Sequence, residues 1–590
     1  MTANVDQIEI ELFKNGIFSI ADEMAATIVR TAYSTVVRDN MDFSTAVTNA
    51  KGEVVAQGLT IAGHLGSIPV AIRHLLEKYG SNIFPGDVLI LNDPYNGGMH
   101  LPDIFIFRPI FAEERLIAFA ASVCHHSDVG GRVPGSNAAD STEIYQEGVR
   151  IPPLKMYERG VPNDTLMALL RQNVRMPEQL FGDLRSQLAA ARVAERRLLE
   201  LCATYGADKT VRYLSDIIDY AERMTRAAIA KLPDGVFSFD DWIDDDGVEL
   251  GKPVPLKVKV TKAGEKITID WTGSSPQVQG AINATMSFTQ AASYCAVRSI
   301  LPDPIPENEG MFRAIDVIAE KGSVLNVVLP GACAARGLTG FRMLDCLFGA
   351  LAQMVPDRVF AASDGGIVGL SIGGYKSADR SPFVYVEFSS ASWGGRPHAD
   401  GLDGVANLLS NVCLPSVEVI ESLHPIEIRA VEFVADTGGA GLHRGGSAIR
   451  REYRLNEENA TLQVRVDRAL EQPYGLYGGL PGASSINIMD GPDGPKKVPG
   501  KTTLRFNRQQ RFSLTTGGGG GWGDPLARDP RAVFRDVADG FVTVEAARRD
   551  YAVVLGPDGP DTAATEALRA ERCASATPAG SFVNPAKHAA

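Results

Sequence analysis

Apolar residues recur at near-helical spacing along the first part of the chain and predict a long helix over residues 5–37. A second helix is predicted over 67–79, where Ser67 precedes the apolar run and can cap it. Two apolar stripes between residues 176 and 232 are separated by Gly206, and this arrangement predicts a pair of helices. Two shorter helices are predicted over 289–301 and 340–354.

Shorter runs of alternating or continuous apolar residues predict strands. A hairpin is predicted from 43–47 and 54–56, with Lys51 and Gly52 in its turn. Residues 235–272 carry the clearest alternation and predict an antiparallel sheet. The other predicted strands are 88–92, 104–111, 116–123, 322–329, 384–389 and 503–506.

Together these elements predict an α+β fold: a multidomain mixed fold with a long N-terminal helix, antiparallel or mixed sheets and a helical hairpin. At 590 residues the chain can bury a large core. The pattern changes near Pro233, where we place a domain boundary. The expected regions are 1–175 with the candidate metal site, 176–232 as the helical hairpin, 233–525 as a β-rich α+β domain, and 526–590 as a C-terminal helix with a tail that is loose after about Thr562.

Composition narrows the class of protein. With 45% hydrophobic and 22% charged residues the chain is typical of a globular protein, and its net charge of −13 argues against a nucleic-acid-binding surface. The acidic run from Asp240 to Asp246 is interpreted as an exposed loop. Seven dispersed cysteines without a C-x-x-C pair, and the lack of a signal peptide or a long apolar segment, favour a cytoplasmic protein without a membrane span.

Candidate metal ligands gather between Leu91 and Gly131. Three of the nine histidines lie there, accompanied by Asp93, Asp103 and Asp128. His100 and Asp103 are three residues apart in a loop, and His125 ends a strand that can return beside that loop as a hairpin partner. A divalent cation needs several deprotonated donors that converge on one point, so these residues form a candidate site. No standard zinc spacing matches, and loop carboxylates with structural histidines remain the alternative.

The same stretch resembles the hydantoinase B/oxoprolinase family, which includes metal-binding subunits of ATP-dependent hydantoinases, lactamases and ketone carboxylases. The family pattern Asn-Asp-Pro-Tyr-x-Gly-Gly-x-His-x-x-Asp is present from Asn92 to Asp103, and an Arg-x-x-x-Asp-Phe-Ser motif matches Arg38 to Ser44. The resemblance implies that four residues bind a metal: Asp42, His100, Asp103 and His125. Two imidazoles and two carboxylates suit Zn, Mn or Fe.

Other residues near these motifs are candidates for proton transfer. His126 or Asp128 is expected to accept a proton or to support a ligand, although His126 can equally be buried away from the ion because successive strand residues diverge. Glu143 lies in a segment that is very similar to one in the family, together with Glu147 and Arg150, and is a candidate for the wall of the site. A solvated loop is the alternative for that segment. His64 is expected either to line the site or to pack as a structural histidine.

The sequence lacks a convincing nucleotide-binding signature. Residues 494–502 nearly form a P-loop, but five residues separate the two glycines and a strand-like run follows. Residues 436–446 are rich in glycine and are interpreted as a tight structural turn. The resemblance implies a separate ATPase partner, a hydantoinase A-like subunit that binds the ATP, and we therefore expect a hetero-oligomer.

The resemblance implies an ATP-dependent hydrolase of a cyclic amide such as a hydantoin, a lactam or oxoproline. By analogy, the partner phosphorylates the carbonyl oxygen and a metal-bound hydroxide attacks that carbonyl. One alternative is a subunit of an ATP-dependent ketone carboxylase of the acetone or acetophenone type. Another is a noncatalytic structural partner of the ATPase. An iron oxygenase with two histidines and one carboxylate is disfavoured, because its usual His-x-Asp spacing is absent.

Overall fold

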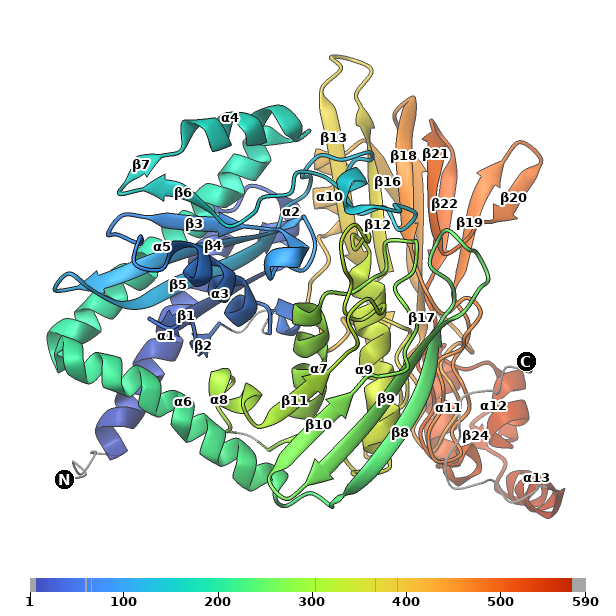
Figure 1. Cartoon of the computed structure of the whole chain (residues 1–590). Coiled ribbons are helices and arrows are strands. Elements are labelled where there is room, and N and C mark those ends of the chain that lie inside the picture. The colour runs from blue at the N-terminus through green and yellow to red at the C-terminus, as the bar shows by residue number, and fades with distance from the viewer. Residues whose placement is uncertain are drawn as a thin grey trace.

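The structure, a computed structural model, describes residues 7–58, 61–64, 66–302, 304–366, 368–389 and 391–575. The N-terminal part of the chain contains a sheet of seven antiparallel strands in the order β2-β1-β5-β4-β3-β6-β7 (Figure 1). The predicted hairpin of residues 104–111 and 116–123 is confirmed, because β4 and β5 pair along their length. The strands are β1 (Phe43–Asn49), β2 (Val54–Gln57), β3 (Val88–Leu91), β4 (Asp103–Ala112), β5 (Arg115–His125), β6 (Leu154–Glu158) and β7 (Val161–Pro162).

The first helix ends earlier than its apolar pattern predicts. α1 spans Gln7–Thr31, and a separate short helix, α2, spans Thr35–Arg38. The break falls at Ser34, whose backbone is extended and whose side chain accepts a hydrogen bond from Val37 N–H. Ser34 therefore starts a new helix, and the apolar pattern continues across the break because both helices pack on the same core. Val5 lies outside the described residues.

The predicted helical pair is confirmed. α5 (Pro177–Tyr205) and α6 (Ala207–Ile229) are separated by Gly206, whose φ of +82° suits a glycine. α5 packs against α1 and against β4 and β5 of the sheet (Figure 1). The remaining helices of this half are α3 (Ile68–Tyr79), α4 (Asp164–Asn173) and the short 3-10 turns η1 (Ala62–His64), η2 (Pro94–Asn96) and η3 (Ile144–Gln146).

A second sheet, in the order β11-β10-β9-β8, follows the predicted boundary. Its strands are β8 (Gly235–Ile243), β9 (Val254–Ala263), β10 (Lys266–Asp270) and β11 (Ile315–Ile318). The strand predicted over 322–329 is wrong. That segment turns back on itself through hydrogen bonds such as Gly322 N–H to Asn326 O, and its buried Val324 and Leu325 mimic a strand pattern. The helices beside this sheet are α7 (Met286–Ile300), α8 (Glu309–Phe312) and α9 (Arg336–Ala352).

The acidic run is not the exposed loop that its composition suggests. Asp241 lies on β8, and both it and Asp244 are buried. Arginines from distant segments supply the compensating charge: Arg342 and Arg468 lie 3.4 and 3.5 Å from the Asp241 carboxylate. The prediction failed because these partners are about 100 or more residues away and leave no local signal.

Two further sheets occupy the C-terminal half, in the orders β13-β12-β18-β21 and β16-β17-β22-β19-β20 (Figure 1). Their strands are β12 (Val368–Tyr375), β13 (Pro382–Ser389), β16 (Ile426–Val434), β17 (Ala448–Leu455), β18 (Asn459–Arg465), β19 (Ile486–Gly491), β20 (Gly494–Lys497), β21 (Lys501–Asn507) and β22 (Arg511–Thr515). The rejected P-loop segment thus forms part of a hairpin. Smaller elements are β14 (Ala391–Ser392), β15 (Asp403–Val405), α10 (Val417–Leu423) and η4 (Pro525–Ala527).

The C-terminal part is helical. It contains α11 (Pro530–Ala538), α12 (Val544–Tyr551), the strand pair β23 (Leu555–Gly556) and β24 (Gly559–Pro560), and α13 (Thr562–Ser575). The expectation of a loose tail from Thr562 therefore differs from the structure over α13, and residues 576–590 lie outside the described part. None of the described helices is long and apolar enough to span a membrane.

Extended glycine-rich segments form a layer that we call the glycine layer. It consists of the glycine-rich segments 393–401, 437–446, 473–483 and 517–523 together with the segment 361–364, which has no glycine, and these segments exchange backbone hydrogen bonds. A Cβ on Gly445 would lie 1.9 Å from Gly519 O, and one on Gly520 would lie 2.0 Å from Tyr474 O. Only glycine allows such close backbone contact. The glycine-rich stretch 436–446 therefore has a structural role, as expected, although it extends beyond a single turn.

One apolar cluster joins the first sheet to the region after residue 233. It includes Phe107 of β4, Trp271 after β10 and Leu347 of α9. The prediction of a mixed fold with several sheets is confirmed. The candidate site lies where the first sheet meets α9 and the sheet of β12 and β18 (Figure 1).

Candidate metal centre

The β4–β5 hairpin brings together three of the predicted ligands. Asp103 begins β4, His125 ends β5, and these two residues are direct cross-strand partners. His100 stands three residues before the strand, in the loop that follows η2. One ligand atom from each of these buried residues lies within 4.8 Å of the other two, so a single cation can reach all three.

Several polar atoms of this group have no hydrogen-bond partner among the described residues. They are His100 Nδ1, Asp103 Oδ1 and His125 Nδ1, all buried. His100 Nδ1 lies 2.7 Å from Asp103 Oδ2, but without the alignment of a hydrogen bond. Buried polar atoms are normally satisfied, so three unpaired electron-pair donors at one point fit a bound divalent cation.

Two neighbours fix the orientation of this group. Arg336 Nη2 donates a hydrogen bond of 2.6 Å to Asp103 Oδ2 from the first residue of α9. The side-chain amide of Asn137 lies 3.2 Å from His125 Nε2. A ligand histidine is usually held through the ring nitrogen that does not bind the metal. The amide nitrogen of Asn137 donates to Nε2 and so places the ring proton on Nδ1; turning the amide over, so that the unpaired Asn137 Oδ1 accepts from Nε2–H, would leave the Nδ1 lone pair for a metal.

Asp42, the fourth predicted ligand, lines the same cavity but stands outside the close group of three. It directly precedes β1, and its Oδ1 lies 3.8 Å from His64 Nε2. Burial raises the pKa of Asp42, and the nearby Asp103 carboxylate raises it further. A cation shared by the two carboxylates would relieve this repulsion. The set of four ligands therefore stays a prediction.

The electrostatic environment keeps the histidines neutral. Burial lowers the pKa of His64 and of His100 to about 4, and it also lowers the pKa of His125. Burial alone would raise the pKa of Asp103, but the positive charge of Arg336 beside it lowers that pKa below its usual value. Neutral imidazoles and an ionised carboxylate are the forms in which these side chains bind metals.

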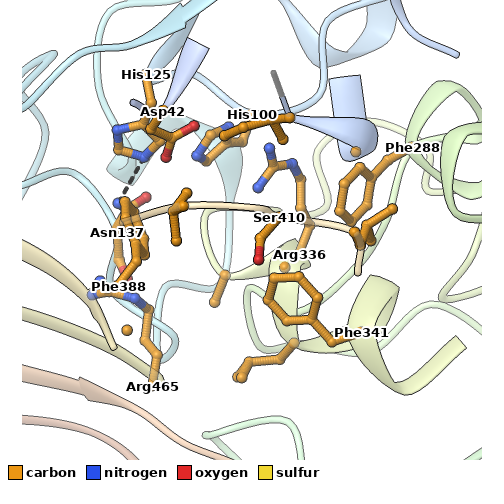
Figure 2. Close-up of a pocket in the computed structure, with 18 of the residues that line it drawn as sticks. Asp42, His100, His125, Asn137, Phe288, Arg336, Phe341, Phe388, Ser410 and Arg465 are labelled. Carbon is orange, nitrogen blue, oxygen red and sulfur yellow. Dashed lines mark hydrogen bonds between the residues drawn. The ribbon is translucent and has the colours of Figure 1, made fainter. Parts of the chain in front are cut away.

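The group opens on a cavity of about 80 Å³ between the first sheet and α9. Figure 2 shows His100, His125 and Asp42 together on one side of this cavity and the rings of Phe288, Phe341 and Phe388 around it. The size and the apolar wall suit a small ligand whose polar atoms face the metal group.

The three residues predicted to transfer protons do not line this cavity. His126 points toward α5, where its Nε2 lies 3.4 Å from Gln187 Oε1. Asp128 accepts hydrogen bonds from Gly130 N–H, Gly135 N–H and Arg175, which organise a loop. Glu143 is exposed. Their catalytic roles gain no geometric support.

His64 and Glu147 were also candidates for the wall of the site, and the structure places His64 in the cavity wall and Glu147 directly behind it. His64 lines the cavity, where its Nδ1 lies 3.0 Å from Ser44 Oγ. Glu147 is buried behind the cavity wall and accepts hydrogen bonds from the N–H groups of Cys333 and Ala334, three and two residues before Arg336. Burial raises its pKa to about 8.

Sequence reasoning missed Asn137, Arg336 and Arg465, which also line the cavity. Arg336 is 233 residues from its partner Asp103, and Arg465 is 328 residues from its partner Asn137. Neither arginine stands in a motif whose spacing points to the metal group, so only the folded chain brings them to it.

The chain belongs to the hydantoinase B/oxoprolinase family, whose pattern matches residues 6–525. It is 32% identical to the B-type component of the putative D-/L-hydantoinase of Pseudomonas sp. (strain NS671), covering 93% of this chain and 95% of that one. It is 31% identical to the beta component of the caprolactamase of Pseudomonas jessenii, covering 96% and 99% respectively. Both relatives are named as subunits of their enzymes.

Two solved structures share the fold. The crystal structure of the ATP-dependent caprolactamase from Pseudomonas jessenii matches with a TM-score of 0.88 and 29% identity, over 96% of this chain and all of that one (100%). A nucleotide-free acetone carboxylase structure matches with a TM-score of 0.89 over 97% of this chain and 84% of that one, at 20% identity. The second likeness shows the fold alone.

Proposed function

We propose that this chain is the metal-binding subunit of an ATP-dependent cyclic amide hydrolase and works with a separate ATPase subunit of the hydantoinase A type. The observation that carries the proposal is the convergence of His100, Asp103 and His125 on one side of a small cavity, in a chain of the hydantoinase B family. The names of the hydantoinase and caprolactamase relatives as subunits support both the substrate class and the partner.

Asp42, His100, Asp103 and His125 would hold a Zn, Mn or Fe ion, which would supply Lewis acidity beside the cavity. Arg336 keeps the Asp103 carboxylate in place, and Asn137 orients the ring of His125. The rings of Phe288 and Phe341 line the cavity and would shield a bound ligand from bulk water. ATP would be bound and used by the partner, which would activate the amide carbonyl by phosphorylation.

His64 is our candidate for the proton acceptor in place of His126. The Ser44 hydroxyl donates to Ile61 O, so its oxygen is left to accept a hydrogen bond from His64 Nδ1. That tautomer leaves a lone pair on Nε2, the atom that faces Asp42 and the cavity. A neutral imidazole with a free nitrogen next to the reacting ligand can take up a proton.

The test is to produce the chain with its ATPase partner and to assay hydrolysis of hydantoins, lactams and 5-oxoproline with ATP. His100→Ala should lose both the bound metal, measured by elemental analysis, and the activity. His74→Ala is the matched control, because His74 lies on α3 beside Glu77, with about a third of its side chain exposed, and should change neither. Undiminished hydrolysis by the His100→Ala complex rejects the proposal.

The second candidate, which the family resemblance leaves open, is a subunit of an ATP-dependent ketone carboxylase; the fold shared with acetone carboxylase does not by itself decide between the two reactions. Bicarbonate-dependent turnover of ketones, with no turnover of cyclic amides, would identify it. In a purely structural subunit the ligand substitutions would shift the melting temperature, while turnover stayed proportional to the amount of folded complex.

A further inference from the structure

Arg465 is a buried cation at the cavity without a compensating carboxylate. It ends β18, is 4% exposed and lines the cavity that His100 and His125 also line. Its guanidinium donates hydrogen bonds to Asn137 O at 3.1 Å and to Ser371 Oγ at 3.2 Å. No described Asp or Glu forms an ion pair with it. Burying an unpaired charge is costly, so this arrangement needs a reason.

The rest of the molecule makes this arrangement exceptional. Every other buried arginine in the described part of the chain pairs with at least one carboxylate. These arginines are Arg336 with Asp103, Arg342 with Asp467, Arg444 with Asp403, Arg451 with Glu387, Arg468 with Asp345 and Arg528 with Asp400. Among these described arginines Arg465 alone lacks such a partner, and it is also at the cavity.

The formal charges at the cavity also indicate that an anionic ligand binds there. Arg336 and Arg465 carry two positive charges, and a divalent ion at the proposed metal centre adds two more. The carboxylates of Asp42 and Asp103 supply only two negative charges. The site thus keeps two positive charges in excess, which an anionic ligand would balance. Arg336 Nε, also buried, has no hydrogen-bond partner among the described residues.

The backbone leaves room for the Arg465 guanidinium. Gly369 of β12 lines the cavity, and a Cβ at this position would lie 2.6 Å from Arg465 Nε and 2.9 Å from Nη2. In Figure 2, Arg465 lies at the opposite end of the cavity view from His100, with Asn137 and Phe388 beside it. Because His100, His125 and Arg465 line one cavity, a ligand in it can contact both the metal group and Arg465.

We propose that Arg465 binds an anionic oxygen group, a phosphate or a carboxylate, on the ligand that occupies this cavity. A guanidinium presents paired N–H donors that match either group. The proposal deepens the proposed function and rests on it, because it assigns an anionic substrate to the same cavity. The phosphate would come from activation by the partner, and the carboxylate would belong to the substrate itself.

The test measures binding to the purified, metal-loaded chain by calorimetry. The probes are inorganic phosphate, 5-oxoproline, and 2-pyrrolidinone, which has the same ring without the carboxylate. Arg465→Gln should weaken binding of an anionic probe by at least about tenfold and leave the metal content unchanged. Gly369→Ala, which keeps the charge but displaces the guanidinium, should weaken the same probe. Arg38→Gln is the control, since that partly exposed arginine pairs with Asp39 away from the cavity.

Each outcome decides something. Binding of phosphate that depends on Arg465 supports an activated, phosphorylated ligand. Binding of 5-oxoproline that depends on Arg465, without binding of phosphate, supports a substrate carboxylate. Equal binding to the wild type and to both variants, or no binding of either anionic probe to the wild type, overturns the proposal. Metal content is measured separately. If the wild-type chain bound no metal but still bound an anionic probe through Arg465, the proposed function would be rejected and the anion-binding role of Arg465 would stand.

Discussion

Asp103 accepts a hydrogen bond of 2.6 Å from Arg336, which lies 233 residues further along the chain. The pair joins the first residue of β4 to the first residue of α9, and it is buried on both sides. It therefore fixes one wall of the cavity against the other. It also fixes the position of a carboxylate that the proposed metal centre needs.

Replacing Arg336 tests whether a cation shares its role. Arg336→Met should lower the free energy of unfolding by on the order of 3–5 kcal/mol when the metal is removed with a chelator, because the Asp103 charge is then buried without Arg336. The loss should be smaller in metal-loaded protein, where a second positive charge compensates Asp103. Urea denaturation with and without the chelator measures both values. Arg38→Met should show the same small change in both conditions, and a metal-independent loss for Arg336→Met would contradict the shared role.

The position of Asp42 outside the close group predicts a graded effect on metal binding. His100→Ala and His125→Ala should abolish binding, because they remove members of the convergent group. Asp42→Asn should weaken it by about 10- to 100-fold, the range typical of groups that support a site without being its main ligands. Competition with a chromogenic chelator gives the affinities. Complete loss in Asp42→Asn would show that Asp42 is as essential a ligand as the histidines.

The raised pKa of Glu147 predicts that the stability of the protein depends on pH. Burial raises its pKa to about 8 from an ordinary value of 4.5. Between these values the unfolded chain has released a proton that the folded chain still holds, so this group lowers the free energy of unfolding as pH rises. Glu147→Gln keeps an acceptor for the Cys333 and Ala334 N–H groups and removes the ionisation. Its stability relative to the wild type should increase by up to about 3 kcal/mol from pH 5 to pH 8.

Thermal or urea denaturation at several pH values measures this difference. The control is Glu143→Gln, four residues earlier, because Glu143 is exposed. The change with pH should be larger for Glu147→Gln than for Glu143→Gln. A difference between Glu147→Gln and the wild type that does not vary with pH would mean that Glu147 ionises normally in the folded protein.

Two glycines should respond to alanine in opposite directions. A Cβ on Gly520 would lie 2.0 Å from Tyr474 O within the glycine layer, so Gly520→Ala should prevent the layer from closing and yield little folded protein. Gly16 lies inside α1 with its nearest neighbour, Leu201 Cδ2, 3.5 Å from an added Cβ. Gly16→Ala should raise the free energy of unfolding by about 0.5–1 kcal/mol. Soluble yield and denaturation curves decide both, and a well-folded Gly520→Ala would contradict the close packing.

Local patterns predicted much of the fold. The β4–β5 hairpin and the pair α5 and α6 follow from apolar periodicity and from Gly206, because these signals lie within the elements themselves. The break at Ser34 could not be predicted in this way, because the apolar pattern continues from α1 into α2. The turns over 322–329 could not either, because buried apolar residues there pack on the core without forming a strand. The burial of Asp241 was invisible because its arginine partners are remote in the chain.

For the candidate site too, local signals predicted some residues and tertiary packing determined the others. His100, Asp103 and His125 stand in one hairpin and its adjoining loop, so their spacing and the family motif pointed to them together. His126 was proposed as a neighbour of His125, but the alternation of a strand sends its ring to Gln187 on the other face. Arg336 and Arg465 reach the cavity only through tertiary packing, and a single sequence carries no sign of it.

The glycine layer also depends on a segment that is synthesised late. Its last segment in the chain, 517–523, forms hydrogen bonds with backbone groups of the four segments that precede it, through contacts such as Gly520 N–H to Ala362 O and Gly519 N–H to Gly446 O. When the earlier segments leave the ribosome, some of their backbone amides and carbonyls lack the hydrogen-bond partners that residues 517–523 later provide. A message cut short before this point yields a chain with open backbone edges, prone to aggregation and proteolysis. The layer can therefore close only in a chain that has been synthesised through residues 517–523.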